Sequence, residues 1–378
     1  MVQRRSEKTR DDLTLLPSDS QVVVACKRLM GRIYDKALAK GDQLDTQEVL
    51  CQTLNMGGGT ISAAMRSLVD AGVLTRRRRV GTLLADSRAW VPGLWTVGVA
   101  SFLTQGQGSG SFFADLSHRL QGHLRFRACR VQSYMLAVQA GEDPPAIVHF
   151  EEALRDLESD RIDVLVTPTY VPTNIDRYRP SLRNKRIIHV GFQESAKMAV
   201  VIDEARFARE ATAALVTRGC KKLGLVTSSP AEKTTDTTFG AGFSQGVQEA
   251  GLASSARFLH GGFGLPGGRV VAEQLLTMSP ADRPDGLVVT DDWIAMGLAS
   301  TLRSHEGYRP MIAVQTNLQT PLAFALPVIR FSVDIDELAV RAVEMVVDRL
   351  TSANREGQVA HVPARRVDDS AAEMPSEI

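Results

Sequence analysis

The chain has 378 residues, of which 44% are hydrophobic and 23% charged, and its 44 lysines and arginines nearly balance its 43 acidic residues. This length and composition predict two or three packed domains and exclude a largely disordered chain. The apolar runs are too short to cross a bilayer, the first residues are too polar for a secretory signal, and the four cysteines form no C-x-x-C pair. We therefore expect a cytoplasmic protein with no membrane partner, disulfide, metal or cofactor.

The small net charge hides two parts of opposite sign. Residues 1–90 hold 15 lysines and arginines against 10 acidic residues, whereas residues 91–378 hold 29 against 33. A basic N-terminal part on an acidic body favours a polyanionic partner for the N-terminal part alone. The alternative at this point is that the uneven distribution of charge along the chain arose by chance.

The N-terminal part carries the pattern of three helices and a hairpin. Polar residues over 1–19 predict a flexible arm. Apolar residues at helical spacing predict helices over 20–40, 47–54 and 60–71. Two short extended segments, 73–75 and 82–84, follow around Arg76-Arg77-Arg78-Arg79-Val80-Gly81, which predicts a β-hairpin with a basic tip.

This pattern is typical of a winged helix-turn-helix domain, which we place at 20–85. In such a domain the third helix enters the major groove of DNA and the wing neutralises phosphates. A solvated charge run is the alternative for the arginines, and a flexible turn without a ligand is the alternative for the three glycines before the third helix. The predicted contacts to double-stranded operator DNA are Thr46, Gly57, Gly58, Gly59, Thr60, Ser62, Arg66, Arg76, Arg77, Arg78, Arg79 and Thr82.

Strand and helix patterns alternate through the rest of the chain, after a linker over 86–94. The predicted strands cover 95–101, 125–134, 164–167, 186–190, 222–227, 256–259, 286–290, 311–314 and 328–331. The predicted helices cover 112–123, 145–159, 204–218, 240–250, 268–278, 294–305 and 334–351. This alternation predicts parallel sheets covered by helices, in two α/β lobes with a ligand cleft at the carboxyl ends of the strands. We place this body at 95–368, followed by a tail over 369–378.

The stretch 41–84 resembles the winged-helix head of the GntR family. The matching positions are Leu44, Thr46, Leu50, Leu54, Thr60, Ile61, Leu68, Gly72, Gly81 and Thr82. Where that family has arginines on and before its recognition helix, this chain has Glu48, Gly58 and Ser62. The resemblance therefore implies a DNA-binding head that depends on phosphate contacts and the arginine hairpin more than on guanine reading by arginine.

The body resembles the effector domain of the LacI/GalR repressors, which is itself similar to periplasmic sugar-binding proteins. The segments that carry this resemblance, in the family's order, are 95–100, 112–116, 201–203, 211–215, 219–226, 242–252 and 283–297. The resemblance implies a two-lobed, periplasmic-binding-protein-like α/β domain with a sugar-like effector between its lobes. Together with the head, it implies a homodimeric transcription regulator, in the first instance a repressor.

The family's effector-binding positions transfer only in part. Asp291 stands where the family has an asparagine, and Phe239 where it has an arginine that contacts the effector. Trp293 can stack on a sugar ring or be an ordinary core residue. The predicted effector-binding residues are Phe112, Tyr170, Gln193, Phe239, Asp291, Trp293, Thr316 and Asn317. The missing arginine leaves the class of sugar open.

Enzymatic motifs are incomplete in this sequence. Gly106, Gly108 and Gly110 follow the first strand of the body, but their G-x-G-x-G spacing is not the G-x-G-x-x-G of dinucleotide-binding proteins. The pair Asp291-Asp292 has no accompanying cluster of histidines or acids, so we expect no enzymatic activity, and a nucleotide-dependent enzyme is the weakest alternative. A DNA-binding protein whose body only dimerises and binds no effector is the stronger one.

Overall fold

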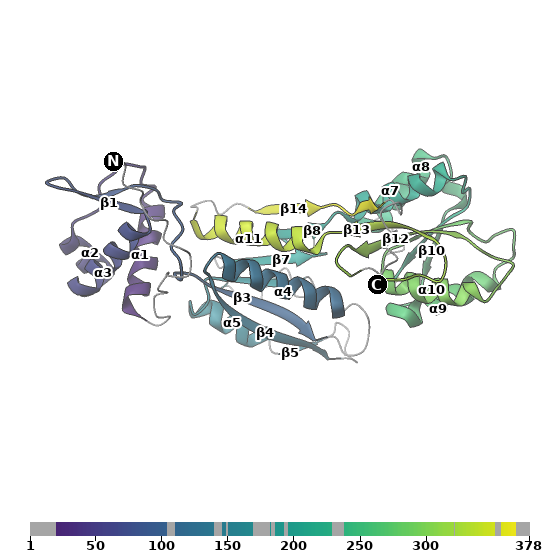
Figure 1. The fold of residues 1–378 in the computed structure, drawn as a ribbon, viewed down its shortest axis with the longest axis horizontal. Helices are drawn as coiled ribbons and strands as arrows, with labels where there is room; N and C mark the ends of the chain where they lie inside the picture. Colours follow the sequence, from purple (N-terminus) through teal and green to yellow (C-terminus); the bar gives the residue numbers. More distant parts are fainter. Residues whose placement is uncertain are drawn as a thin grey trace, which may run out of the picture.

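A computed structural model describes residues 20–103, 110–139, 146–148, 150–168, 182, 186–192, 196–228, 238–320, 322–351 and 357–367. The chain forms a helical head followed by an elongated body with two lobes (Figure 1). The predicted arm over 1–19 and tail over 369–378 lie outside the described residues, as do the predicted effector residues Tyr170 and Gln193.

The head contains helices α1 (Gln21–Asp35), α2 (Gln47–Leu54) and α3 (Gly58–Asp70), then strands β1 (Leu74–Arg77) and β2 (Gly81–Leu84). Their apolar faces meet in a core in which Leu29, Leu50, Ile61 and Leu68 are no more than 1% exposed. The two strands pair antiparallel with Leu74 opposite Leu84. This register buries leucines at the base of the hairpin and leaves its arginines at the solvent-exposed tip.

Lobe 1 is built on a seven-stranded sheet with the order β14-β8-β7-β6-β3-β4-β5. Its strands are β3 (Thr96–Leu103), β4 (Arg130–Gln139), β5 (Ala146–Val148), β6 (Val164–Pro168), β7 (Ile187–Gly191), β8 (Met198–Ile202) and β14 (Gln358–Val362). Alternate residues of β3 point to opposite faces: Val97 and Val99 pack under α4 (Gly110–Phe126) and α11 (Ile335–Thr351), whereas Ala100 packs under α5 (Phe150–Glu158).

Lobe 2 has a six-stranded sheet with the order β10-β9-β11-β12-β13-β15. Its strands are β9 (Leu223–Thr227), β10 (Arg257–His260), β11 (Gly286–Val289), β12 (Met311–Asn317), β13 (Val328–Val333) and β15 (Arg365–Val367). One face carries α7 (Glu204–Thr217) and α8 (Thr238–Glu249), and the other carries α9 (Gly264–Thr277) and α10 (Asp292–Arg303). A Cβ atom on Gly268 would lie 2.0 Å from the carbonyl oxygen of Ile294, so glycine permits the close packing of α9 on α10.

The described chain passes between the lobes three times. It leaves lobe 1 between β8 and α7, returns between β13 and α11, and crosses again between β14 and β15. These connections lie near one another along the middle of the body in Figure 1. Three short connections of this kind can act as a hinge between the two lobes.

The two α/β lobes with mainly parallel sheets are confirmed, but several predicted boundaries are wrong. Helix α5 begins at Phe150 instead of 145, because 146–148 pairs antiparallel with β4. The strand predicted from 125 begins at Arg130, since α4 continues to Phe126 and ends where Ala128 adopts a φ of 53°. The prediction also missed β5, β8, β14 and β15, of which β5, β14 and β15 lie at sheet edges.

The head is attached to lobe 1 by side-chain contacts as well as by the linker. The Lys27 ammonium on α1 lies 2.7 Å from the carboxylate of Asp163, just before β6. The same carboxylate accepts a hydrogen bond from the Thr96 backbone N–H at 2.8 Å. The indole N–H of Trp90 donates to the carbonyl of Arg127, and one hydrophobic core runs from α1 through Trp95 into lobe 1. The head therefore rests on the end of lobe 1 that is remote from lobe 2.

Candidate functional site

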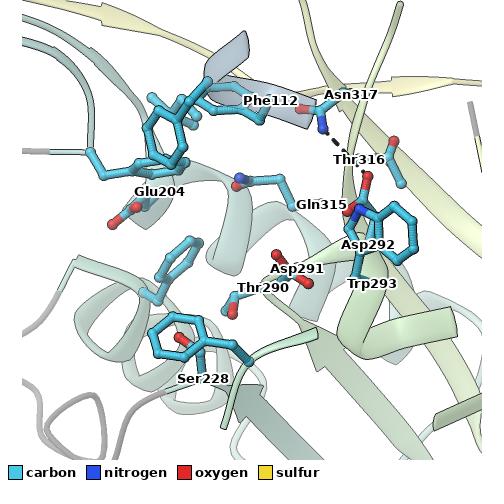
Figure 2. A pocket seen from close by; sticks show the side chains of 15 residues that line it. Phe112, Glu204, Ser228, Thr290, Asp291, Asp292, Trp293, Gln315, Thr316 and Asn317 are labelled. Atoms are coloured by element: carbon cyan, nitrogen blue, oxygen red, sulfur yellow. Dashed lines mark hydrogen bonds between the residues drawn. The ribbon is translucent and has the colours of Figure 1, made fainter. Parts of the chain in front are cut away.

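A cleft with a volume of about 250 Å³ lies between the two lobes. Residues at the carboxyl ends of strands and the first turns of helices line it, as expected for a ligand site in an open α/β fold. The lining residues are Phe112, Phe113, Phe192, Ile202, Glu204, Ser228, Phe239, Phe263, Thr290, Asp291, Asp292, Trp293, Gln315, Thr316 and Asn317. Figure 2 shows their side chains converging on one space.

Aromatic rings form much of the wall. On the lobe 1 side, the ring centroid of Phe112 lies 5.2 Å from that of Phe113 and 5.3 Å from that of Phe192. The lobe 2 side contributes the rings of Phe239 and Trp293, and Phe263 lies at the exposed rim. A ligand in the cleft is therefore offered several aromatic faces and edges.

Two adjacent aspartates lie at the first turn of α10. One carboxylate oxygen of Asp291 caps this helix by accepting from the backbone N–H of Ile294 at 2.9 Å. Asp292 is 6% exposed, and its carboxylate accepts from the side-chain amide of Asn317 at 3.4 Å. Burial raises the pKa of Asp291, and burial together with the charge of Asp291 raises the pKa of Asp292 to about 7. Burial and proximity therefore disfavour two full negative charges at this point.

Two further polar side chains complete the interior. Glu204, the first residue of α7, is 7% exposed and accepts a hydrogen bond from the hydroxyl of Thr238. Gln315 on β12 is also 7% exposed, and its side-chain oxygen has no hydrogen-bond partner in the described part of the structure. A buried acceptor without a partner costs free energy that a donor on a bound molecule can recover.

The structure brings six of the eight predicted effector residues to this cleft: Phe112, Phe239, Asp291, Trp293, Thr316 and Asn317. Their effector contacts stay a prediction. Sequence reasoning missed Asp292, Gln315 and Glu204, although each adjoins a strand end or a crossover between the lobes. The hydroxyl of Thr316 pairs with that of Ser332 at 2.8 Å, so it is occupied within lobe 2.

The predicted DNA-binding residues lie on or next to α2, α3 and the β1–β2 hairpin. Arg66 on α3 and all four of Arg76, Arg77, Arg78 and Arg79 are exposed, whereas Thr60, Ser62 and Thr82 are half-buried. The hydroxyl of Thr46 caps α2 by accepting from the Val49 N–H at 3.4 Å, which gives it a structural role of its own. Gly57, Gly58 and Gly59 are exposed where α3 begins.

Gly57 and Gly59 have no positive φ, and a Cβ atom on either would meet no atom within 4 Å. At Gly58 a Cβ would lie 3.3 Å from the side-chain nitrogen of Gln47. The fold itself therefore does not require glycine at 57 and 59.

Two further properties of the described residues concern metal binding and membrane insertion. In the part of the chain that the structure describes, no group of three or more histidine, cysteine, aspartate or glutamate side chains is arranged to hold a metal ion. None of the described helices combines the length and the apolar character needed to cross a membrane.

A family model of a periplasmic binding protein-like domain matches residues 212–368. The body has the fold of LacI-type effector domains. The match to a LacI transcriptional regulator from a Rhodococcus species covers 72% of this chain and 97% of the regulator's chain, with 18% identity and a TM-score of 0.56. The Cra dual regulator of Pseudomonas putida, solved with fructose 1-phosphate, covers 72% and 97% at 19% identity and a TM-score of 0.55.

The match to the lac repressor dimer, solved with operator and the anti-inducer ONPF, covers 72% of this chain and 92% of the repressor's chain, with 14% identity and a TM-score of 0.59. No curated protein matches the chain in sequence.

Proposed function

We propose that this protein is a transcription regulator that binds DNA through its head and a small sugar-like effector through its interlobe cleft. The observation that carries the proposal is the combination of a polar, aromatic cleft in a LacI-type body with a separate basic head on the same chain. Of the similar structures named above, one holds a sugar phosphate and one holds both operator DNA and an anti-inducer. We take the protein to be a cytoplasmic homodimer that acts as a repressor.

The head is best explained as a GntR-like winged helix-turn-helix. Its α3 is the candidate recognition helix, and its hairpin β1–β2 is the candidate wing. The bare backbone at Gly57 and Gly59 supports a close approach to a phosphate, because packing gives no other reason for glycine there. The exposed arginines of the hairpin would add phosphate contacts nearby.

The hinge between the lobes supports a switch. An effector that contacts Phe112 and Phe192 on lobe 1 together with Asp291 and Gln315 on lobe 2 would favour closure of the cleft. In a twofold dimer, a change in lobe angle would alter the spacing of the two heads and hence their fit to two half-sites. Coupling of this kind requires that the effector has different affinities for the DNA-bound and free states.

The experiment is a fluorescence-anisotropy titration of the full chain against DNA from upstream of its own gene, across a salt series. Each lost phosphate contact reduces the slope of log K against log salt by about 0.9, which is about 3.5-fold in affinity between 50 and 200 mM salt. Arg77→Ala and Arg78→Ala should each show this reduction on every DNA sequence. Arg269→Ala, an exposed arginine on α9, is the matched control and should bind like the parent protein.

Two outcomes would contradict parts of the proposal. Slopes that are unchanged in both hairpin variants would remove the hairpin from the DNA interface. Tight DNA binding that no sugar or sugar derivative alters, with no thermal stabilisation by any of them, would favour the alternative in which the body only dimerises.

A further inference from the structure

We propose that the ligand of the interlobe cleft is a small organic cation with hydroxyl groups, of the amino-sugar class, and not a neutral or phosphorylated sugar. This inference deepens the proposed function and rests on it, because it takes the cleft to be the effector site. Three features of the described lining carry it: its charge, its aromatic rings and one buried acceptor without a partner.

The charged residues in the described lining are all acidic. Glu204, Asp291 and Asp292 all line the cleft, and none of the described lining residues is a lysine, arginine or histidine. A phosphate or carboxylate ligand would place like charges together in a partly desolvated space, which opposes binding. The Cra structure with fructose 1-phosphate shows that this fold can hold an anionic sugar, but the described lining here offers no basic partner for a phosphate.

The aspartate pair favours a cation for a physical reason. Asp292 is 6% exposed and adjacent to Asp291, so burial and mutual repulsion both oppose its ionised form. A positive charge brought within a few ångströms favours that ionised form and is itself attracted by it. The described contacts supply no such charge, since Asp292 is paired with the neutral amide of Asn317 and Asp291 with a backbone N–H. An ammonium group on a ligand would provide it.

The aromatic wall suits the same ligand. Rings attract a cation through their faces, and tryptophan does so most strongly. Trp293 directly follows the aspartate pair on α10, and Figure 2 shows its ring beside Asp292. The lining therefore combines carboxylates with aromatic faces, the two kinds of group that bind an organic cation.

The amide of Gln315 is independent evidence for a bound molecule. It is 7% exposed, and its oxygen is a buried acceptor without a partner among the described residues. In Figure 2 its side chain extends into the space between Glu204 and Asp291. A hydroxyl or ammonium donor on the ligand would satisfy it. The cleft volume of about 250 Å³ lies just below the roughly 300–1,000 Å³ of pockets for drug-sized ligands, which favours a single sugar ring.

The test compares sugars that differ at one substituent and hence in charge. The probes are glucosamine with glucose, galactosamine with galactose, and mannosamine with mannose, together with glucose 6-phosphate. Each is added to the full chain at pH 7, the melting temperature is measured, and dissociation constants are then determined by calorimetry. We expect at least one amino sugar to bind 10-fold or more tightly than its neutral parent, and glucose 6-phosphate not to bind. A neutral parent that binds as tightly as its amine, a phosphate that binds best, or no binding by any amine would each overturn the inference.

Charge-removing variants identify the groups responsible. Asp292→Asn should weaken the binding of the amino sugar by 10-fold or more. It should leave the weak binding of the corresponding neutral sugar unchanged. Asp291→Asn retains a residue type that caps helices well, so it tests the second carboxylate even if Asp292→Asn folds poorly. Asp348→Asn, an exposed aspartate on α11, is the control and should bind the amino sugar like the parent protein. Equal binding by all three variants would remove the aspartate pair from recognition.

DNA titrations with the same probes separate this inference from the proposed function. A neutral sugar that binds and releases the protein from its operator would overturn the cation inference and support regulation. An amino sugar that binds tightly and changes no DNA affinity would support the cation inference and contradict regulation.

Discussion

The ion pair between the head and lobe 1 gives a prediction whose magnitude and pH dependence both follow from the structure. Replacing Lys27 by methionine removes the ammonium, whose nitrogen lies 6.0 Å from the centroid of the Trp95 ring, and keeps an unbranched apolar chain in its place. Asp163 then remains with the Thr96 N–H as its described hydrogen-bond donor. The two side chains are 22% and 9% exposed, between the exposed pairs that contribute about 0–1 kcal/mol and the buried pairs whose disruption costs about 3–5 kcal/mol. We therefore expect Lys27→Met to lower the free energy of unfolding by roughly 2 kcal/mol.

The sign of the pH dependence follows from the pKa of Asp163. Burial raises this pKa in the folded protein, and the charge and hydrogen bond of Lys27 oppose that rise. An acid whose folded pKa exceeds its unfolded pKa loses stability as pH rises between the two values. Lys27→Met removes the charge and the hydrogen bond of Lys27, while the Thr96 hydrogen bond and the charge of Arg186 remain, so the folded pKa rises further. The deficit of the variant should therefore be larger at pH 8 than at pH 5.

The assay is urea denaturation followed by tryptophan fluorescence, because Trp90 and Trp95 lie at the junction between head and lobe 1. The double variant Lys27→Met with Asp163→Asn should recover most of the loss, since the uncompensated charge is gone. Lys36→Met is the matched control: its partner Asp45 is more exposed, so about 1 kcal/mol or less should be lost. A Lys27→Met deficit no larger than the control, or equal at both pH values, would refute the reasoning.

Three further predictions test the head, the packing of lobe 2 and the cleft. Gly59→Ala should stabilise the protein to urea by about 0.4–1 kcal/mol, because its methyl group meets nothing, and yet weaken DNA binding in the anisotropy assay. A variant that binds DNA normally would argue against backbone approach at α3. Gly242→Ala should instead destabilise lobe 2 by about 1–3 kcal/mol in thermal denaturation, because its Cβ would lie 2.1 Å from the Ala205 carbonyl oxygen. Since the pKa of Asp292 is about 7 against an ordinary 3.8, the ligand-free protein should lose stability from pH 4 to pH 7. Asp292→Asn should lack this loss of stability between pH 4 and pH 7. Identical profiles of stability against pH for the variant and the parent protein would contradict the raised pKa.

Local patterns were enough to predict the head and most of the parallel strands. Helical spacing such as Leu29, Met30 and Ile33 produces a single buried face, and α1 is found where that spacing lies. The hairpin also followed from local signals, namely turn residues between two short apolar segments. In the head, where each element has a strong local pattern, the sequence alone predicts the order of helices and strands.

Two of the missed strands, β14 and β15, depend on partners that are distant in sequence. β14 pairs with β8, and β15 pairs with β13. Val359 is 38% exposed and Arg365 is exposed, so these edge strands lack the continuous apolar run of a central strand. No local pattern states which sheet edge they complete.

The candidate site was predicted where family positions exist and missed where geometry alone defines it. Asp291 was predicted because it stands where the LacI/GalR family, which the body resembles, has an asparagine. Gln315 was missed because only the folded protein shows that its amide is buried without a partner. Glu204 and Phe192 come from opposite lobes, and no sequence spacing shows that they line one cleft.

The pairing of β14 and β15 also bears on how the chain acquires its structure. Residues 357–367 supply an edge strand to each lobe, one beside β8 and the other beside β13. During synthesis the head can be complete after residue 84, whereas both sheets wait for these late strands. A chain that stops before residue 357 would move the sheet edges inward to β13 and to β8, whose five residues are all buried in the full chain, and exposed apolar edges recruit other chains. Premature termination should therefore yield aggregation of the whole body, not a protein with one intact lobe.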